Sequence, residues 1–181
     1  MISRMDALKG VDVFIEAAAI LSKNKILSNL HFIHIGTHSE YVFQQGYYED
    51  CLKRVDNLGI KTYFTFLDYS EEILAYYKYF DLLVLPTLKD TLSYTNIEAN
   101  FNKIPVIFTD IDGLMETSKP EFGCSIPYPP SPLILANKLE ELLLDKEKYC
   151  LLQKQIFNYI EERFNAEKNA AHLVKIYESV Q

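Results

Sequence analysis

Asp81-Leu82-Leu83-Val84-Leu85-Pro86 is the stretch that decides the fold of this 181-residue chain. Its run of aliphatic residues leaves no polar face, which is typical of a strand covered on both sides within a parallel sheet. Pro105-Val106-Ile107-Phe108 repeats the pattern after a short helical segment. The two stretches therefore predict two strands of a parallel sheet with a helix between them.

On both sides of this stretch the chain alternates between strand-like and helix-like patterns. Further strands are expected at 2–4, 30–35, 62–67 and 124–126, which makes about six in all. Helices are expected at 9–23 and 41–58, from Ser70 and from Ser93, and then at 132–144, 148–163 and 166–180. This alternation predicts an α/β domain, a Rossmann-like doubly wound parallel sheet followed by C-terminal helices. Its ligands should bind outside the carboxyl ends of the strands.

Composition limits the class of protein. The net charge of −7 argues against nucleic acid as a partner, and no stretch approaches the ~20 apolar residues of a membrane span. Residues 1–6 have no apolar run behind their basic residue, so no signal peptide is expected. Cys51, Cys124 and Cys150 have apolar neighbours and predict buried, reduced thiols. We expect one soluble, cytoplasmic domain over residues 1–181.

The polar residues that follow the decisive strand are the best candidates for chemistry. Asp90 lies in the loop, a helix opens near Ser93, and Glu98 lies about a turn and a half into that helix. Backbone N–H groups at a helix start can hold a phosphate or sugar oxygen, and carboxylates accept paired hydrogen bonds from vicinal hydroxyls. Taken alone, the acids equally fit a solvated loop aspartate and a surface-helix glutamate.

Other polar clusters are weaker candidates. Asp110-Ile111-Asp112 has the spacing of some metal sites, but its position directly after a strand favours a turn. His31, His34 and His38 lie near one strand end and favour ordinary strand and loop side chains over a ligand set. The aromatic cluster at 76–80 favours packing at a helix end, with base stacking as the alternative. No metal site is therefore expected.

The order and spacing of these features resemble the C-terminal domain of the glycosyltransferase family 4 (group 1) enzymes, which adopt the GT-B fold. In that family a strand ending in Leu-Pro-Ser is followed by a Glu, a Gly-Phe-Gly-like turn, and a second Glu eight positions after the first. Asp90 and Glu98 occupy the positions of these acids. Residues 103–113 resemble the family's Gly-Lys-Pro-Val-Val-Ala-Thr-Asp-x-Gly-Gly segment, and residues 4–12 resemble Gly-Arg-Leu-x-x-x-Lys-Gly-x-x. The resemblance covers essentially the whole chain.

The resemblance implies a site for a nucleotide sugar, which would be a UDP-, GDP- or ADP-sugar. Arg4 and Lys9 would neutralise the donor diphosphate, because fixed cations stabilise the charge that a leaving nucleoside diphosphate develops. Asp90 would contact the donor sugar and Glu98 the ribose hydroxyls, and these two acids are the candidate catalytic residues. The family transfers sugar with retention of configuration and without a metal or other cofactor.

Two departures from the family pattern concern this site. The first acid is Asp90 rather than Glu, which shortens its reach to the sugar. The glycine turn is replaced by Thr91-Leu92-Ser93, which removes conformations with positive φ and close backbone approach to a ligand. Either the loop is rebuilt around hydroxyls, with Thr91 at the sugar or ribose and Ser93 at the diphosphate, or donor binding is weakened. Ser93 alternatively only caps the helix.

A GT-B active site lies between two domains, and the N-terminal one supplies the acceptor pocket. That half is not present in this sequence, so we expect a donor-binding half, either an expressed fragment or a truncated gene product, that transfers no sugar alone. The acceptor is unknown, and any membrane association would be peripheral and through the intact enzyme. Two alternatives remain: a binding or interaction module with a degenerate donor site, and a fragment of a GT-B sugar-nucleotide epimerase.

Overall fold

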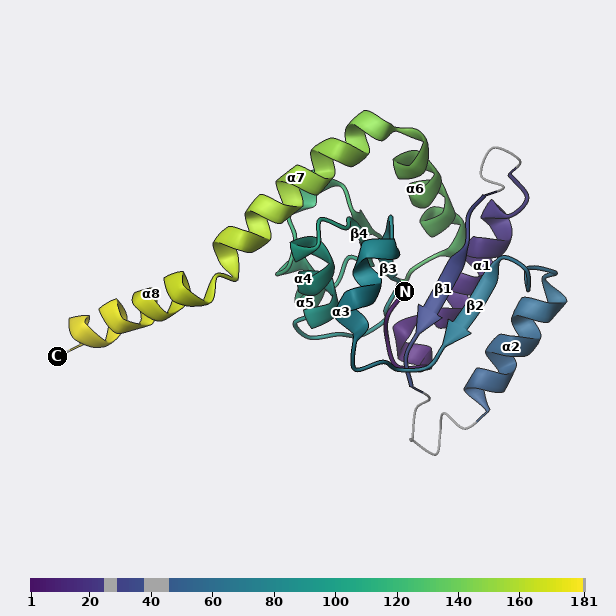
Figure 1. Ribbon diagram of the computed structural model, residues 1–181, viewed down its shortest axis with the longest axis horizontal. Helices are drawn as coiled ribbons and strands as arrows, with labels where there is room; N and C mark the ends of the chain where they lie inside the picture. The colour runs from purple at the N-terminus through teal and green to yellow at the C-terminus, as the bar shows by residue number, and fades with distance from the viewer. Residues whose placement is uncertain (25–28, 38–45, 181) are drawn as a thin grey trace.

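The computed structural model describes residues 1–24, 29–37 and 46–180, and its strands are all parallel (Figure 1). Strand β1 (Phe32–Ile35) pairs with β2 (Phe64–Leu67). Strands β3 (Leu83–Leu85), β4 (Val106–Thr109) and β5 (Ser125–Ile126) form a second sheet in that order. The predicted α/β architecture with parallel strands is confirmed.

The expected N-terminal strand is an extended segment that runs beside β1. The α-amino group of Met1 donates a hydrogen bond to the Ile33 carbonyl at 2.7 Å. The amides of Ile35 and Ser3 bond to the carbonyls of Met1 and Ile35, both at 3.0 Å. Because Ile2 makes one isolated parallel bridge, the described residues contain five strands rather than the expected six. This segment lies between the two sheets, as the N-terminus in Figure 1 shows.

Helices cover both faces of the β3–β4–β5 sheet. All residues of β3 and β4 are buried, as their unbroken apolar sequence predicts. Helix α6 (Pro132–Leu144) contacts β4 and β5 and packs on α1 (Val11–Leu21). Helix α4 (Tyr94–Phe101) contacts β3 and β4 and packs on α7 (Lys146–Arg163). The sheet is therefore doubly wound.

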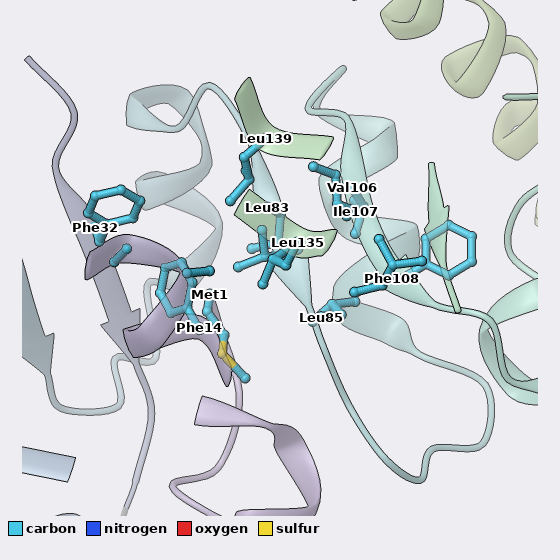
Figure 2. Packing of buried hydrophobic residues seen from close by; sticks show 14 of the residues in the cluster. Met1, Phe14, Phe32, Leu83, Leu85, Val106, Ile107, Phe108, Leu135 and Leu139 are labelled. Carbon is cyan, nitrogen blue, oxygen red and sulfur yellow. The ribbon is translucent and has the colours of Figure 1, made fainter. Parts of the chain in front are cut away.

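The core joins the two sheets through α1. The apolar residues that recur at helical spacing along α1 are buried: Val11, Phe14, Ile15, Ala18 and Leu21. The Phe14 ring lies with its centroid 5.9 Å from that of Phe32 and 5.2 Å from that of Phe64. Figure 2 shows Phe14, Phe32 and Met1 on one side of the core and Val106, Ile107 and Phe108 of β4 on the other. Burial of these side chains is the main force that holds the sheets together.

Several remaining elements differ in extent from their expected ranges. Helix α2 (Tyr47–Asn57) packs on α1, and residues 41–45 of its predicted range lie outside the described residues. The helix expected from Ser70 is the short pair α3 (Ile73–Tyr76) and η4 (Tyr77–Tyr79). The structure adds three short elements that the patterns did not predict: η1 (Ala7–Lys9), α5 (Asp112–Met115) and η5 (Pro120–Phe122).

The C-terminal helix α8 (Ala166–Ser179) has no buried residue and projects from the end of α7 (Figure 1). Its bounds agree with the predicted range to within one residue. Among the described residues, none of the helices combines the length and the apolar character that crossing a membrane requires.

The three cysteines do not share one environment, so the prediction that all are buried is wrong for Cys150. Cys51 and Cys124 are buried, and burial raises the pKa of Cys51 to about 11 and that of Cys124 to about 12. Cys150 is exposed on α7. The inner face of α7 carries Leu152, and Cys150 lies two positions earlier, about 200° around the helix.

Candidate functional site

A cleft of about 240 Å³ opens at the carboxyl end of β3, next to the N-terminal segment. This edge is where parallel α/β sheets bind their ligands. Four of the predicted site residues line the cleft, whereas Thr91 and Glu98 do not. The lining consists of Met1, Ile2, Ser3, Arg4, Lys9, Leu85, Thr87, Asp90, Leu92, Ser93, Tyr94 and Thr95.

The loop before α1 is held against the loop after β3. The carbonyl of Leu8 accepts hydrogen bonds from the Leu88 amide and from the Thr87 hydroxyl, both at 2.8 Å. Gly10 has a φ of 71°, and a Cβ at this position would lie 1.9 Å from the Pro86 carbonyl oxygen. Only glycine permits this approach, which brings the preceding residue, Lys9, to the end of the strand.

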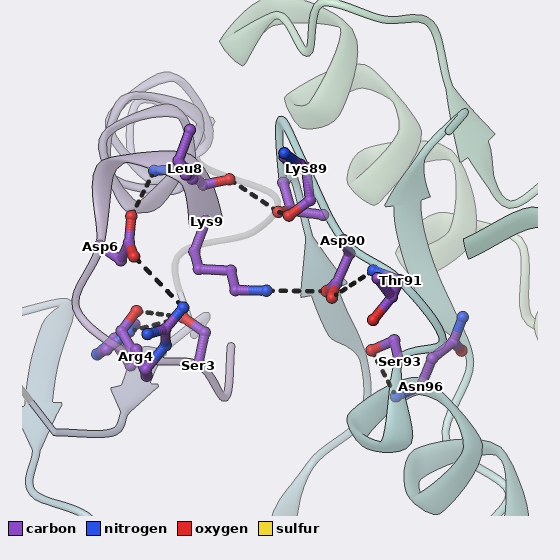
Figure 3. Close-up of polar contacts among 12 residues, drawn as sticks. Ser3, Arg4, Asp6, Leu8, Lys9, Lys89, Asp90, Thr91, Ser93 and Asn96 are labelled. Carbon is purple, nitrogen blue, oxygen red and sulfur yellow. Dashed lines mark hydrogen bonds and ion pairs between the residues drawn. The ribbon is translucent and has the colours of Figure 1, made fainter. Parts of the chain in front are cut away.

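Lys9 and Asp90 form an ion pair across the cleft, with 2.9 Å between Nζ and Oδ2 (Figure 3). The two side chains are 18% and 19% exposed, so water screens their attraction less than it would on the surface. The other oxygen of Asp90 accepts a hydrogen bond from the Thr91 amide at 3.0 Å. The structure therefore pairs Lys9, the residue predicted to bind the diphosphate, with Asp90, the residue predicted to bind the sugar.

Arg4 lies on the same side of the cleft as Lys9, across from Asp90, with Asp6 as its partner (Figure 3). Its guanidinium is 3.6 Å from Asp6 Oδ2, and the Arg4 side chain is 51% exposed whereas that of Asp6 is 3% exposed. Asp6 also caps η1 by accepting a hydrogen bond from the Leu8 amide at 2.8 Å. Asp6 is not among the residues predicted for the site, although an aspartate before a helical turn is a typical N-cap.

The turn that replaces the family's glycines adopts ordinary backbone conformations. Among the described non-glycine residues, Lys103 alone has a positive φ, so Thr91, Leu92 and Ser93 do not. Ser93 is buried and caps α4, with its hydroxyl accepting a hydrogen bond from the Asn96 amide at 3.4 Å. Thr91 is exposed outside the cleft. The loss of glycine therefore introduces no positive-φ strain into this turn.

Glu98 lies one helical turn beyond Tyr94 and Thr95, which line the cleft. Its Oε2 accepts a hydrogen bond from the Tyr77 hydroxyl at 3.0 Å. Tyr77 is fully buried, and burial, with the Glu98 charge beside it, raises the pKa of this phenol. Of the aromatic cluster at 76–80, Tyr77 is buried and packs on Phe80 as predicted, whereas Tyr79 is exposed. Sequence patterns could not find the contact between Tyr77 and Glu98, which are 21 positions apart.

The weaker candidates are dispersed. Asp110 follows β4 and Asp112 begins α5, and among the described residues no three His, Cys, Asp or Glu side chains are grouped as metal ligands. His31 Nε2 lies 2.8 Å from the Thr65 hydroxyl. His34 is buried within β1, with its Nε2 3.2 Å from the Ser3 hydroxyl. His38 lies outside the described residues.

The cleft combines two cations, one acid and a helix N-terminus, which is the chemistry expected for an anionic, hydroxyl-bearing ligand. The family model of the glycosyl transferases group 1 matches residues 1–159. This chain belongs to that family. The family match covers most of the chain. As predicted, this group 1 domain has the fold of one half of a GT-B glycosyltransferase.

This chain spans less than half the length of two of the proteins that it resembles, D-inositol 3-phosphate glycosyltransferase and HepE. The chain is 24% identical over 182 residues to D-inositol 3-phosphate glycosyltransferase of Corynebacterium urealyticum, covering 99% of the chain and 42% of that protein. A crystal structure of HepE from Anabaena with UDP superposes with a TM-score of 0.85 at 19% identity, over 98% of this chain and 47% of HepE. The C-terminal domain of the group 1 protein LpcC from Francisella tularensis gives 0.80 at 22% identity, over 91% and 85%.

Proposed function

We propose that this domain binds a nucleotide-diphospho-sugar in the cleft at the end of β3 and presents it for glycosyl transfer. The observation that carries the proposal is the convergence of Arg4, Lys9, Asp90 and the N-terminus of α4 on one cleft, in a group 1 glycosyl transferase. The similar HepE structures contain UDP and UDP-glucose, which supports a nucleotide-sugar ligand here. The candidate ligands are UDP-, GDP- and ADP-sugars.

The diphosphate would lie between the two cations and the start of α4. Lys9 has three N–H donors and uses one for Asp90, so the others can reach a phosphate oxygen. The first amides of α4 and the helix dipole favour negative charge at the same place. Together these groups would stabilise the nucleoside diphosphate as it leaves the sugar. Asp90 would then accept hydrogen bonds from the sugar while it holds Lys9.

The nucleoside would lie along α4, with its ribose hydroxyls at Glu98. A helical turn advances about 5.4 Å, which separates a phosphate at the helix start from a ribose one turn later. Thr91 and Ser93 are weaker members of the proposed site. The Ser93 hydroxyl caps α4, and the Thr91 hydroxyl would need a donor that extends past the cleft.

Titration with UDP, GDP, ADP and their sugars, followed by thermal shift or NMR, tests the proposal. At least one of these ligands should bind. Lys9→Ala and Glu98→Ala should each lower the affinity for it by about tenfold, the effect of losing a charge-assisted contact. Lys175→Ala, on the exposed helix α8, is the matched control and should leave the affinity unchanged. The same affinity with EDTA present would support a site without a metal.

The rival is a binding module with a degenerate donor site. Two observations favour it: the charge of Lys9 is balanced by Asp90, and the apolar Leu92 lines the cleft. No response to any of the nucleotides would support this rival and contradict the donor site. Conversion of a sugar nucleotide without an acceptor would instead identify an epimerase.

We further propose that an N-terminal domain supplies the acceptor site, as the greater length of the relatives suggests. The 181-residue chain should then bind its donor without transferring the sugar. Addition of a separately expressed N-terminal domain should restore transfer. Transfer by the chain alone would contradict this division of labour.

A further inference from the structure

We propose that Tyr77 is a positioning residue that orients the Glu98 carboxylate toward the ribose of the nucleotide. The inference rests on the proposed function and deepens it, because it assigns a role to a side chain that is buried beneath the site. The observation that carries it is the hydrogen bond from the Tyr77 hydroxyl to Glu98 Oε2, at 3.0 Å.

Packing fixes the position of the Tyr77 hydroxyl. The residue is 0% exposed, and its ring meets Phe80 edge-on, with 6.2 Å between centroids and 82° between planes. The hydroxyl also lies 3.5 Å from the carbonyl oxygen of Thr95, one turn before Glu98 on α4. A phenol held from η4 in this way is a rigid donor with little freedom to follow a moving carboxylate.

The hydrogen bond restricts the conformations of Glu98. A glutamate on a helix surface has several rotamers, and ordering them costs conformational entropy when a ligand binds. Among the side chains that the structure describes, it is Tyr77 that donates a hydrogen bond to the Glu98 carboxylate. Because it holds Oε2, Oε1 and the remaining lone pair of Oε2 can accept bonds from two vicinal hydroxyls. The carboxylate would thus be pre-organised before the ligand arrives.

The protonation of the phenol suits this role. Burial and the negative charge of Glu98 both raise the pKa of Tyr77, so its hydroxyl is protonated and can donate at neutral pH. A buried tyrosine needs a partner for its hydroxyl in any case. If the Tyr77 hydroxyl has a solely structural role, its removal should weaken the binding of every ligand equally. If it positions Glu98, its removal should weaken the binding only of ligands that carry the ribose hydroxyls.

The test compares Tyr77→Phe with wild type in the 181-residue chain, using UDP, its 2′,3′-dideoxy analogue and pyrophosphate as ligands. The variant should bind UDP about fivefold to tenfold more weakly, as for one lost hydrogen bond, and bind the other two ligands as wild type does. ADP and GDP, if they bind, should show the same loss. In a Glu98→Ala background, Tyr77→Phe should have no further effect.

Tyr149→Phe is the matched control, because it also removes a tyrosine hydroxyl, one that donates to the Asp81 carbonyl at 2.7 Å. It should leave all three affinities unchanged. An equal loss for UDP, dideoxy-UDP and pyrophosphate in Tyr77→Phe would show a structural role and overturn the inference, as would unchanged UDP binding. If wild type binds no nucleotide, the proposed function itself fails and this inference is withdrawn with it.

Discussion

At the scale of single residues, the site depends on how its charges are paired. Lys9 is joined to Asp90 at 2.9 Å and Arg4 to Asp6 at 3.6 Å, so each cation of the cleft has an acid beside it. A diphosphate bound to the free N–H donors of these cations would lie close to the negative charge of the two carboxylates. The acids should therefore lower the affinity for simple anions and leave more of the binding energy to the sugar and the nucleoside.

The variant Asp90→Asn should test this balance. Removing the negative charge leaves Lys9 more available, so pyrophosphate and UDP should bind about threefold to tenfold more tightly at low salt. The advantage of a nucleotide sugar over its nucleoside diphosphate should shrink, because the amide accepts sugar hydroxyls less well. Calorimetric titration at two salt concentrations measures both effects. Asp112→Asn, an exposed aspartate on α5, is the control, and weaker pyrophosphate binding by Asp90→Asn would contradict the argument.

The buried α-amino group of Met1 predicts a dependence of stability on pH. Burial lowers its pKa to about 5 from an ordinary value near 8, so between these values the unfolded chain binds the proton and the folded chain does not. The free energy of unfolding should therefore rise from pH 5 to pH 8, by roughly 4 kcal/mol at most. Urea denaturation across this range measures the rise. Acetylation of the terminus should remove the rise in the free energy of unfolding between pH 5 and pH 8. The same rise in the acetylated chain would contradict this assignment to Met1.

At the scale of elements, α4 organises the site. Its N-terminus faces the cleft, and buried amides fix its other side to the segment after α5. Asn96 is 0% exposed, donates to the Thr117 hydroxyl at 2.5 Å and accepts from the Asn100 side chain at 2.7 Å. Gly113 packs against the same region, since a Cβ there would lie 2.1 Å from the Thr91 carbonyl oxygen.

Asn96→Ala should therefore destabilise the domain. Its removal leaves buried polar partners without their hydrogen bonds, which costs about 1–3 kcal/mol. The midpoint of urea denaturation should fall, and nucleotide affinity should fall with it if α4 shifts. Asn137→Ala, an exposed position on α6, should change the free energy of unfolding by less than about 0.5 kcal/mol. Equal stability of the two variants would contradict a role for this network.

At the scale of the whole molecule, α8 stands apart from the rest. It projects from the end of α7 and has no buried residue, whereas the core lies among the sheets, α1, α4, α6 and α7 (Figure 1). The stability and the proposed site of this domain should therefore not depend on it.

Truncation after Phe164 should leave the domain folded. Because α8 buries none of its side chains, the free energy of unfolding should change by less than about 0.5 kcal/mol, and nucleotide affinity should stay the same. Urea denaturation and the titration described above measure these quantities. A loss of stability of more than about 1 kcal/mol would show that α8 packs on the domain in solution.

The global burial pattern also predicts thiol reactivity. Cys150 is exposed, whereas Cys51 and Cys124 are buried with raised pKa values. A thiol reagent should label Cys150 rapidly in the folded chain, because access and thiolate content control the rate. The other two should react only on unfolding. Cys150→Ser should abolish the fast phase, and fast labelling of that variant would contradict the packing.

The order of strands and helices could be predicted because it is written in local patterns. Unbroken aliphatic runs identified β3 and β4, and the helical spacing of apolar residues identified α1, α6, α7 and α8. The expected N-terminal strand is a single bridge at Ile2, and the helix expected from Ser70 begins at Ile73 and is short. Such short elements depend on pairing and packing more than on propensity. Arg4, Lys9, Asp90 and Ser93 were predicted as site residues, and they do line one cleft.

The sequence by itself thus determined the family, the succession of elements and four of the polar residues that line the cleft. Tertiary structure alone decided that Lys9 pairs with Asp90, 81 positions away, and that Tyr77 reaches Glu98. It also decided that Cys150 faces solvent. The physical reason is that periodicity reports which face of an element is buried, whereas pairing between side chains depends on how separate elements approach one another.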